Sequence, residues 1–490
     1  MFPPQNGAST PRSRAGTCGP IQGGGMNAPT NASWFDTVRR NASIAVGAVA
    51  ACALFVTPAA AQGVIRDAEI EHTLRDYSAP LWVAAGLNPD DVSMYIIGDD
   101  EINAFVSGGQ NIFVHTGLIL AARTPNELKG VLAHETGHIA GGHLARSAEA
   151  QQQAMGPALI AIGLGVLAIA AGVPQAGAAL ISGSQAFAMG NYVRHTQVQE
   201  SAADQAALAY LEETDQSAKG LIDFFNNNFR RYEFVMRRAP QYLLTHPYSS
   251  DRVEALRSGA TVADHYNTTD GPEDLARFRT MQAKLIGFLQ TQGQTLARYP
   301  VSDQSADARY ARAIAYYRTA QMDLARTELT SLIAENPTNP YYQELMGQML
   351  YESGRSAESV PYHRRSVELT HDEPLLMLNL ARALADDRDT VDEAITLLNG
   401  VVRIEPLNSL AWSELAEARD FRGEQGLAEL ASAEANYARG NFPAALSFAE
   451  RARRTLPRNT PSFQRASDIA TFSGQEVRDM MEDNNGRRRS

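Results

Sequence analysis

The chain has 490 residues, of which 44% are hydrophobic, and a formal net charge of -12 at pH 7. This length allows two or three domains with sizeable cores. The acidic balance argues against a nucleic-acid partner, because proteins that bind nucleic acids present clusters of Lys and Arg. Both cysteines, Cys18 and Cys52, precede Gln62. Loss of the N-terminal region would therefore leave a chain without thiols, which suits an oxidising compartment.

The N-terminal region has the pattern of an export signal. Arg39 and Arg40 precede an apolar stretch at 44–56, and an A-x-A cleavage site ends at Ala61. Residues 1–61 are therefore predicted to be a disordered extension and signal peptide. Their removal, with four Arg and one Asp, would change the net charge from -12 to about -15. The pattern predicts an exported protein.

Two alternatives remain for this region. Residues before Met26 are rich in Gly, Pro and Ser and lack an apolar core, so Met26 is a second candidate for the true start. The run ending at Cys52 resembles a lipobox, and lipid anchoring through Cys52 is therefore the minor alternative to cleavage after Ala61. The apolar run continues beyond Cys52, which favours cleavage.

The run VLAHETGHIA contains the motif HExxH at His134, Glu135 and His138. Residues four apart lie on one face of a helix, so both imidazoles can bind one metal ion while Glu135 flanks it. Apolar residues recur at helical spacing here, and Thr124 or Asn126 can cap the helix. A zinc peptidase needs three protein ligands and a water molecule, which Glu135 would deprotonate.

The third ligand must come from another part of the chain. A metzincin would place a histidine at Leu144; His143 is one residue short and would turn away from the metal on a continuing helix, so it is interpreted as structural. Downstream, Glu200 and Asp204 lie four apart on one helical face. Glu200 would bind zinc, and Asp204 would orient a ligand histidine or take part in proton transfer. Taken alone, both are better explained as solvated carboxylates.

Four runs occur in the order of a known family: NAFVSGGQNIFVHTGLI, HETGH, ESAAD and THPYSSDR. Together they resemble the M48 metallopeptidases, whose pattern combines HExxH, a distal ExxxD and a late HP…R. The resemblance implies one Zn²⁺ per chain, bound by His134, His138 and Glu200. It also implies that Glu135 is the catalytic base and that Asp204 is its acidic helper.

The same resemblance assigns two residues in the fourth run. His246 and Arg252 match positions that face the metal and stabilise the tetrahedral intermediate beside its developing oxyanion. In the periplasmic, repeat-bearing branch of the family, the histidine that matches His246 can occupy the fourth zinc position. The resemblance therefore implies a site that His246 can hold latent.

Two β-rich runs, Met94–Ile97 and Asn111–Thr116, are separated by polar and glycine positions that suit a turn. The resemblance implies that this segment is the edge strand beside the zinc, to which an extended substrate adds as another strand. Backbone pairing of that kind predicts a loose sequence preference. His115, inside the second run, is interpreted as a packing residue.

A second apolar stretch covers residues 156–173 and is nearly long enough to span a bilayer. A chain that crossed the membrane once between His138 and Glu200 would have to cross back, because both residues must reach one metal ion. The run that follows is short and interrupted by polar residues. Residues 156–190 are therefore predicted to form a Gly/Ala-rich helical hairpin or lid near the cleft, which allows peripheral membrane contact.

Beyond residue 270 the sequence changes to Ala-rich helical pairs. Small residues and prolines recur close to the 34-residue tetratricopeptide period, at Ala313, Ala325, Pro337, Gly347, Ala381 and Pro406. Residues 271–480 are therefore predicted to form an α-solenoid of such repeats, which commonly binds peptides or partner proteins. An unrelated helical bundle is the alternative. The run 481–490 is predicted to be a disordered tail.

The predicted fold is thus mainly α (α+β), with an HExxH metallopeptidase domain at 62–270, a small edge sheet, and the repeats behind it. The resemblance implies a periplasmic zinc endopeptidase that acts on misfolded or stalled outer-membrane β-barrel proteins. The repeats would recruit these clients or the barrel-assembly machinery. The alternative function is a chaperone or adaptor for outer-membrane protein assembly, with a mostly latent zinc site.

Overall fold

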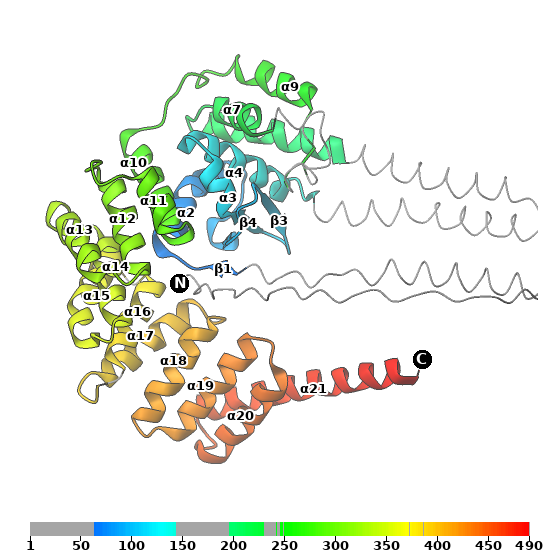
Figure 1. Cartoon of the computed structure of the whole chain (residues 1–490). Coiled ribbons are helices and arrows are strands. Elements are labelled where there is room, and N and C mark those ends of the chain that lie inside the picture. Colours follow the sequence, from blue (N-terminus) through cyan, green and yellow to red (C-terminus); the bar gives the residue numbers. More distant parts are fainter. Residues whose placement is uncertain are drawn as a thin grey trace, which may run out of the picture.

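The computed structural model describes residues 63–143, 196–229, 242, 246–247, 249–371, 373–385 and 387–489. The predictions made for residues 1–61 and for residues 156–190 lie outside these ranges. Within the described ranges, no helix has both the length and the apolar character that crossing a membrane requires. The described chain is mainly helical with one small sheet, as the sequence predicts (Figure 1).

The sheet has four strands in the order β1-β2-β4-β3: Val64–Ile65, Ser93–Ile97, Asn111–His115 and Ala104–Ser107. The two β-rich runs correspond to β2 and β4, but these strands pair in parallel and are not joined by a simple turn. The segment between them forms β3, which pairs antiparallel with β4. Gly108 and Gly109, which both have positive φ, form the tight turn that joins β3 to β4. Strands β1 and β3 are therefore the two edges.

Helices α2 (Ala68–Ala84), α3 (Thr116–Ala121) and α4 (Pro125–Ala140) contact the strands of this sheet. Helix α7 (Lys219–Asn228) packs against α4, α9 (Ser250–Ala260) packs against α7, and a helix over 196–213 lies beside α4. Helix α4 begins as predicted, because Thr124 caps it by accepting a hydrogen bond from the backbone of Glu127. Nearly all of α4 is buried, including Leu128, Val131 and Leu132. The HExxH motif therefore lies on a core helix.

The rest of the chain consists of antiparallel helix pairs, arranged as a curved row in Figure 1. The first helices of the pairs begin about 34 residues apart, which is the tetratricopeptide period. These pairs are α12 (Ala306–Arg318) with α13 (Met322–Glu335), α14 (Pro340–Glu352) with α15 (Ser356–Thr370), α16 (Pro374–Leu384) with α17 (Val391–Ile404), α18 (Ser409–Phe421) with α19 (Gln425–Ala438), and α20 (Phe442–Thr455) with α21 (Pro461–Arg489).

Small residues bring the two helices of a pair together. Ala313, Ala325 and Ala381 are fully buried. At Gly347 a Cβ atom would lie 2.7 Å from the ring of His363 on the partner helix, so no larger residue fits without a shift. The period thus arises from close contacts that recur once per pair.

The repeats are joined to the N-terminal domain through α10 (Pro272–Leu289), which is followed by α11 (Gln292–Arg298). Gln282 donates hydrogen bonds to the carbonyls of Ile119 and Ala122. Lys284, only 2% exposed, lies 2.8 Å from a carboxylate oxygen of Asp67. Helix α10 also contributes apolar side chains to the core around α2 and α4. The first helix after the predicted boundary at residue 271 therefore packs with both parts.

At the C-terminal end the structure differs from the sequence-based expectation. Helix α21 extends to Arg489 and so includes most of the run 481–490, for which a disordered tail is predicted. No proline interrupts the chain after Pro461, so nothing in the backbone stops the helix at residue 480.

Candidate metal centre

Helix α4 and the helix over 196–213 cross closely beside the HExxH motif. A Cβ atom at Gly137 would lie 2.9 Å from the carbonyl oxygen of Ala203 and 3.3 Å from the Cβ of Ala206. Glycine is therefore needed inside HETGH for a packing reason, although it is a poor helix former. This contact brings the face of α4 that carries His134 and His138 next to Glu200.

Substitution Gly137→Ala is expected to lower the free energy of unfolding by about 1–3 kcal/mol, because the added methyl group meets backbone and forces the two helices apart. Gly293, in α11, has no atom within 4 Å of its hypothetical Cβ and provides the matched control. Gly293→Ala should be neutral or slightly stabilising, since alanine favours a helix. Urea unfolding followed by circular dichroism measures both, and equal stabilities of the two variants would contradict the contact.

Four side chains come together at this crossing: His134, Glu200 and His246, which are buried, and His138, which is partly buried. One ligand atom from each lies within 4.8 Å of those of the other three. His134 Nε2 lies 3.1 Å from His138 Nε2 and 3.3 Å from His246 Nδ1. The Glu200 carboxylate oxygens lie 3.0 Å from His246 Nδ1, 3.3 Å from His138 Nε2 and 3.4 Å from His134 Nε2. The four donors therefore converge on one point.

These separations match a tetrahedral metal site. Donor atoms that bind zinc at 2.0–2.1 Å in a tetrahedron lie about 3.3 Å from one another. The donor set, three imidazoles and one carboxylate, is one that transition metals prefer. The residues present therefore fit a single tetrahedral metal ion.

Asp204 and Arg252 lie directly behind the cluster. Asp204 Oδ1 is 3.0 Å from His134 Nδ1, the ring nitrogen that faces away from the other donors. Arg252 forms a bidentate pair with Asp204, with both contacts at 2.8 Å, and its Nη1 lies 3.0 Å from Glu200 Oε2. Arg252 also donates to the carbonyl of Pro247. Its guanidinium is thus held against the carboxylates.

The charges of the site are strongly coupled. Burial opposes ionisation of Glu200, but contacts with His134, His138 and His246 outweigh it and lower the pKa of this carboxyl well below its usual range. Burial likewise opposes ionisation of Asp204, yet contacts with His134 and Arg252 lower its pKa. Both carboxylates are therefore anionic at neutral pH, as metal binding and histidine orientation require.

Glu135 has a different environment. Its side chain is fully buried, and neither carboxylate oxygen has a hydrogen-bond partner among the described residues. Burial raises the pKa of Glu135 to about 7, although His138 and His134 act in the opposite direction. The nearest cluster atom is His246 Nε2, which lies 3.6 Å from Glu135 Oε1. The imidazole of His246 thus lies between Glu135 and the other donors.

His143 lies closer to the cluster than the sequence-based interpretation predicts. Helix α4 ends at Ala140, and the turn through Gly141 and Gly142 folds His143 back. His143 Nδ1 lies 3.0 Å from His138 Nδ1, the ring nitrogen opposite the cluster. His143 is therefore not a member of the cluster, but it contacts a member directly. The two consecutive glycines after the motif were the sequence signal for this turn.

Aromatic side chains that the sequence analysis did not single out surround His246. The ring of Tyr242 is stacked on His246 with centroids 4.5 Å apart, and Tyr242 is stacked in turn on Phe229. Tyr242 is fully buried, and the backbone N–H of His246 donates to its carbonyl. This packing fixes the direction of the His246 ring toward the cluster.

Comparisons with known proteins agree with this geometry. The model of peptidase family M48 matches residues 65–260. The chain is 29% identical over 337 residues to the beta-barrel assembly-enhancing protease of Yersinia pestis, covering 67% of this chain and 68% of that one. It is 29% identical over 328 residues to the protein of the same name from Escherichia coli K12, covering 66% of each.

Among solved structures, the TPR protein YrrB, described as having an unusual peptide-binding site, matches 39% of this chain with a TM-score of 0.30 and 18% identity; 97% of YrrB is covered. The peptidase match, in contrast, spans the sheet, helix α4, the helix over 196–213 and all four residues of the metal cluster. Residues 65–260 are therefore a peptidase family M48 domain, and the chain is a metalloprotease similar over about two thirds of its length to beta-barrel assembly-enhancing proteases.

Proposed function

We propose that the chain is an exported, periplasmic zinc endopeptidase whose resting site is closed by its own fourth ligand. His134, His138 and Glu200 bind one Zn²⁺, and His246 occupies the remaining position. The observation that carries this proposal is that five of the six donor pairs lie 3.0 to 3.4 Å apart, while the sixth, His138 with His246, lies within 4.8 Å. The five shorter separations are close to those of a filled tetrahedron.

A zinc ion bound here would supply a Lewis acid that polarises a carbonyl group and lowers the pKa of a water molecule. Glu135 is the general base, because it is buried beside the cluster and holds no other described partner. Asp204 orients His134 through Nδ1, so that Nε2 points to the metal. Arg252 holds Asp204 and Glu200 in place and adds a positive charge beside the developing oxyanion.

The proposed latency follows from the position of one ring. A catalytic zinc site keeps one coordination position for water, whereas a site with four protein ligands is closed. His246 lies between Glu135 and the donors, at 3.6 Å from Glu135 and 3.0 Å from Glu200. Hydrolysis therefore requires His246 to move away, and a bound client would drive that movement.

We propose that the clients are misfolded or stalled outer-membrane β-barrel proteins. Two considerations support this choice: the relatives named above are called beta-barrel assembly-enhancing proteases, and residues 1–61 have the pattern of an export signal. The repeats at 271–480 would recruit the client or the barrel-assembly machinery, since stacked helix pairs present an extended concave surface.

The zinc content tests the central claim directly. Chain purified without chelators should contain one zinc per molecule by mass spectrometry of the metal. X-ray absorption should show four nitrogen or oxygen ligands, three of them imidazole. A chain that binds no metal, or a site that shows two imidazoles and open water positions, would contradict the closed zinc centre.

A second function is favoured by the same closed geometry. If the protein functions with the four-ligand site closed, it acts as a chaperone or adaptor for outer-membrane protein assembly, and the repeats bind its clients. The two functions differ in whether assembly requires Glu135, and replacement of that residue separates them.

Asp204→Asn is expected to weaken zinc binding about 10- to 100-fold, because the amide cannot replace the carboxylate that orients His134. Asp223→Asn is the matched control: this carboxylate also pairs with a cation, Lys219, but at a partly exposed site outside the cluster. Competition with a chromophoric chelator gives both affinities. Equal affinities for the two variants would show that Asp204 does not support the metal site.

A further inference from the structure

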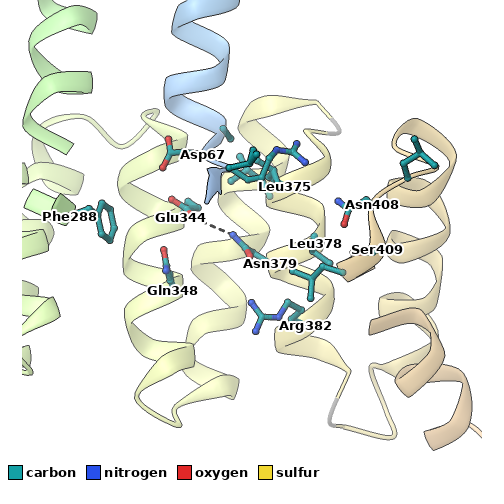
Figure 2. A pocket seen from close by; sticks show the side chains of 16 residues that line it. Asp67, Phe288, Glu344, Gln348, Leu375, Leu378, Asn379, Arg382, Asn408 and Ser409 are labelled. Atoms are coloured by element: carbon teal, nitrogen blue, oxygen red, sulfur yellow. Dashed lines mark hydrogen bonds between the residues drawn. The ribbon is translucent and has the colours of Figure 1, made fainter. Parts of the chain in front are cut away.

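A pocket of about 390 Å³ lies where the first residues of the peptidase domain meet the repeats (Figure 2). Its walls come from β1, the start of α2, and the repeat helices α14, α16 and α18. No member of the metal cluster lines it. The volume is in the range of sites that bind small molecules or single side chains of a peptide.

One side of the pocket is apolar. Leu375 and Leu378 of α16 line it, and Leu407 and Leu410 at the start of α18 do so as well. Leu407 is 73% exposed and Leu410 is 41% exposed, and Val64 of β1, which also lines the pocket, is 49% exposed. Scattered exposed leucines are ordinary, but a group of them inside one pocket indicates a binding surface for apolar side chains.

A group of carboxyl side chains lies at one part of the pocket lining. Glu344 points into it and accepts a hydrogen bond from Asn379 at 3.3 Å (Figure 2). Asp67, beside it, and the neighbouring Glu69 share a single cation, Lys284, at 2.8 and 3.1 Å. Among the described residues, no Lys or Arg forms an ion pair with Glu344. Three carboxylates thus lie around one ammonium group.

The two arginines that line the pocket do not offset this charge. Arg66 lies 2.7 Å from Glu405 and 2.8 Å from Glu71. Arg382 lies 3.1 Å from Glu414. Each guanidinium is therefore already matched by carboxylates outside the pocket. Burial raises the pKa of Glu344 to about 7. A positively charged group of a ligand would lower this pKa and pair with the ionised carboxylate.

The pocket also adjoins a sheet edge. Strand β1 is an outer strand, opposite to β3, and Val64 belongs to both the strand and the pocket wall. A polypeptide in extended conformation can pair with the backbone of such an edge while alternate side chains enter a pocket. This favours an extended chain over a folded surface as the ligand.

We propose that this pocket binds an extended, unfolded polypeptide segment in which a lysine or arginine stands next to aliphatic or aromatic residues. The cation pairs with Glu344, and the apolar neighbours cover Leu407, Leu410 and Val64. The inference rests on the proposed client-recruiting role of the repeats and names the chemistry they select. The peptidase domain contributes β1, so recruitment is shared by both parts of the chain.

Binding is best measured on the full Glu135→Gln chain, which does not cleave the probe. The probe is a fluorescein-labelled peptide that alternates leucine with serine and carries two central lysines; its twin has glutamates in their place. Fluorescence anisotropy should show about tenfold weaker binding of the twin, and of the lysine probe to Glu344→Gln or Leu407→Ser. Binding of the lysine probe should weaken as salt is raised.

Two matched variants control for general effects on the repeats. Glu368→Gln removes a half-exposed carboxylate on α15, and Leu324→Ser removes a 49% exposed leucine on α13; neither residue lines the pocket. Both should bind the lysine probe as the parent does. Identical thermal melts of all four variants exclude unfolding as the cause.

Three results would overturn the proposal. If the pocket variants bind the lysine probe as the controls do, the pocket is not the binding site. If both probes bind equally, the pocket does not select positive charge. Self-association of the parent chain that is lost in Leu407→Ser would identify a second copy as the occupant. Because binding is measured without cleavage, failure here is distinct from a failure of the zinc peptidase proposal, which metal content and peptide cleavage test separately.

Discussion

The Glu135→Gln chain is expected to hold zinc as firmly as the parent and to cleave an unfolded client about 10²- to 10⁴-fold more slowly, the usual contribution of a general base. Glu135 is fully buried, lies next to both ligand histidines in the helix, and has no hydrogen-bond partner among the described residues. Glutamine keeps the shape of the side chain but cannot take a proton. Cleavage of a labelled, denatured β-barrel protein and zinc analysis of the same sample measure the two effects.

The matched control is Glu127→Gln, a buried carboxylate on the same helix whose partners are the backbone of Arg123 and the side chain of Asn227. It should retain cleavage in whatever fraction stays folded. Loss of zinc from Glu135→Gln would instead assign Glu135 a role in the metal site. If cells with Glu135→Gln assemble their outer membrane normally, the chaperone or adaptor function becomes the primary one.

The second large effect is expected from His246→Ala. Zinc should remain bound by His134, His138 and Glu200, and cleavage of an unfolded client should rise about tenfold or more, because the closed state no longer withholds the site from water. The sign of the change is the informative quantity. If His246 chiefly stabilises the tetrahedral intermediate, as the resemblance also allows, activity should fall about 10²- to 10³-fold.

His265→Ala controls for removal of an imidazole elsewhere in the domain. His265 lies 3.1 Å from Glu212 and from Asp215, in a half-exposed position outside the cluster. Its loss should leave cleavage and zinc unchanged. A His246→Ala chain with unchanged activity and an unchanged number of zinc ligands would contradict both roles of His246.

The local part of the candidate site could be predicted from the sequence. His134 and His138 lie four residues apart in an unbroken helix, and this spacing alone directs both rings to one point. The period at which small residues recur in the helix pairs could be predicted for a similar reason, because the two helices of each pair are neighbours in the sequence. Glu200, which looked like a solvated carboxylate, is 2% exposed, and only the family resemblance distinguished it.

The errors have physical causes. A helix was expected to continue through His143, but it ends at Ala140, and the change of direction brings His143 Nδ1 to within 3.0 Å of His138. Strand β3 was missed because Phe105 and its neighbours form a short run without a strong alternating pattern. The pairing of β2 with β4 in parallel follows from the position of β3 at the edge, which local propensity does not encode.

By itself, the sequence determined the candidate HExxH ligands, the helix that carries them and the period of the repeats, because each depends on residues that lie close together along the chain. Only the tertiary structure decided that His246 lies between Glu135 and the other donors, and that residues of β1, α16 and α18 line one pocket together with Glu344. These arrangements join segments more than a hundred residues apart. They depend on how buried surfaces pack, which residue spacing along the chain does not specify.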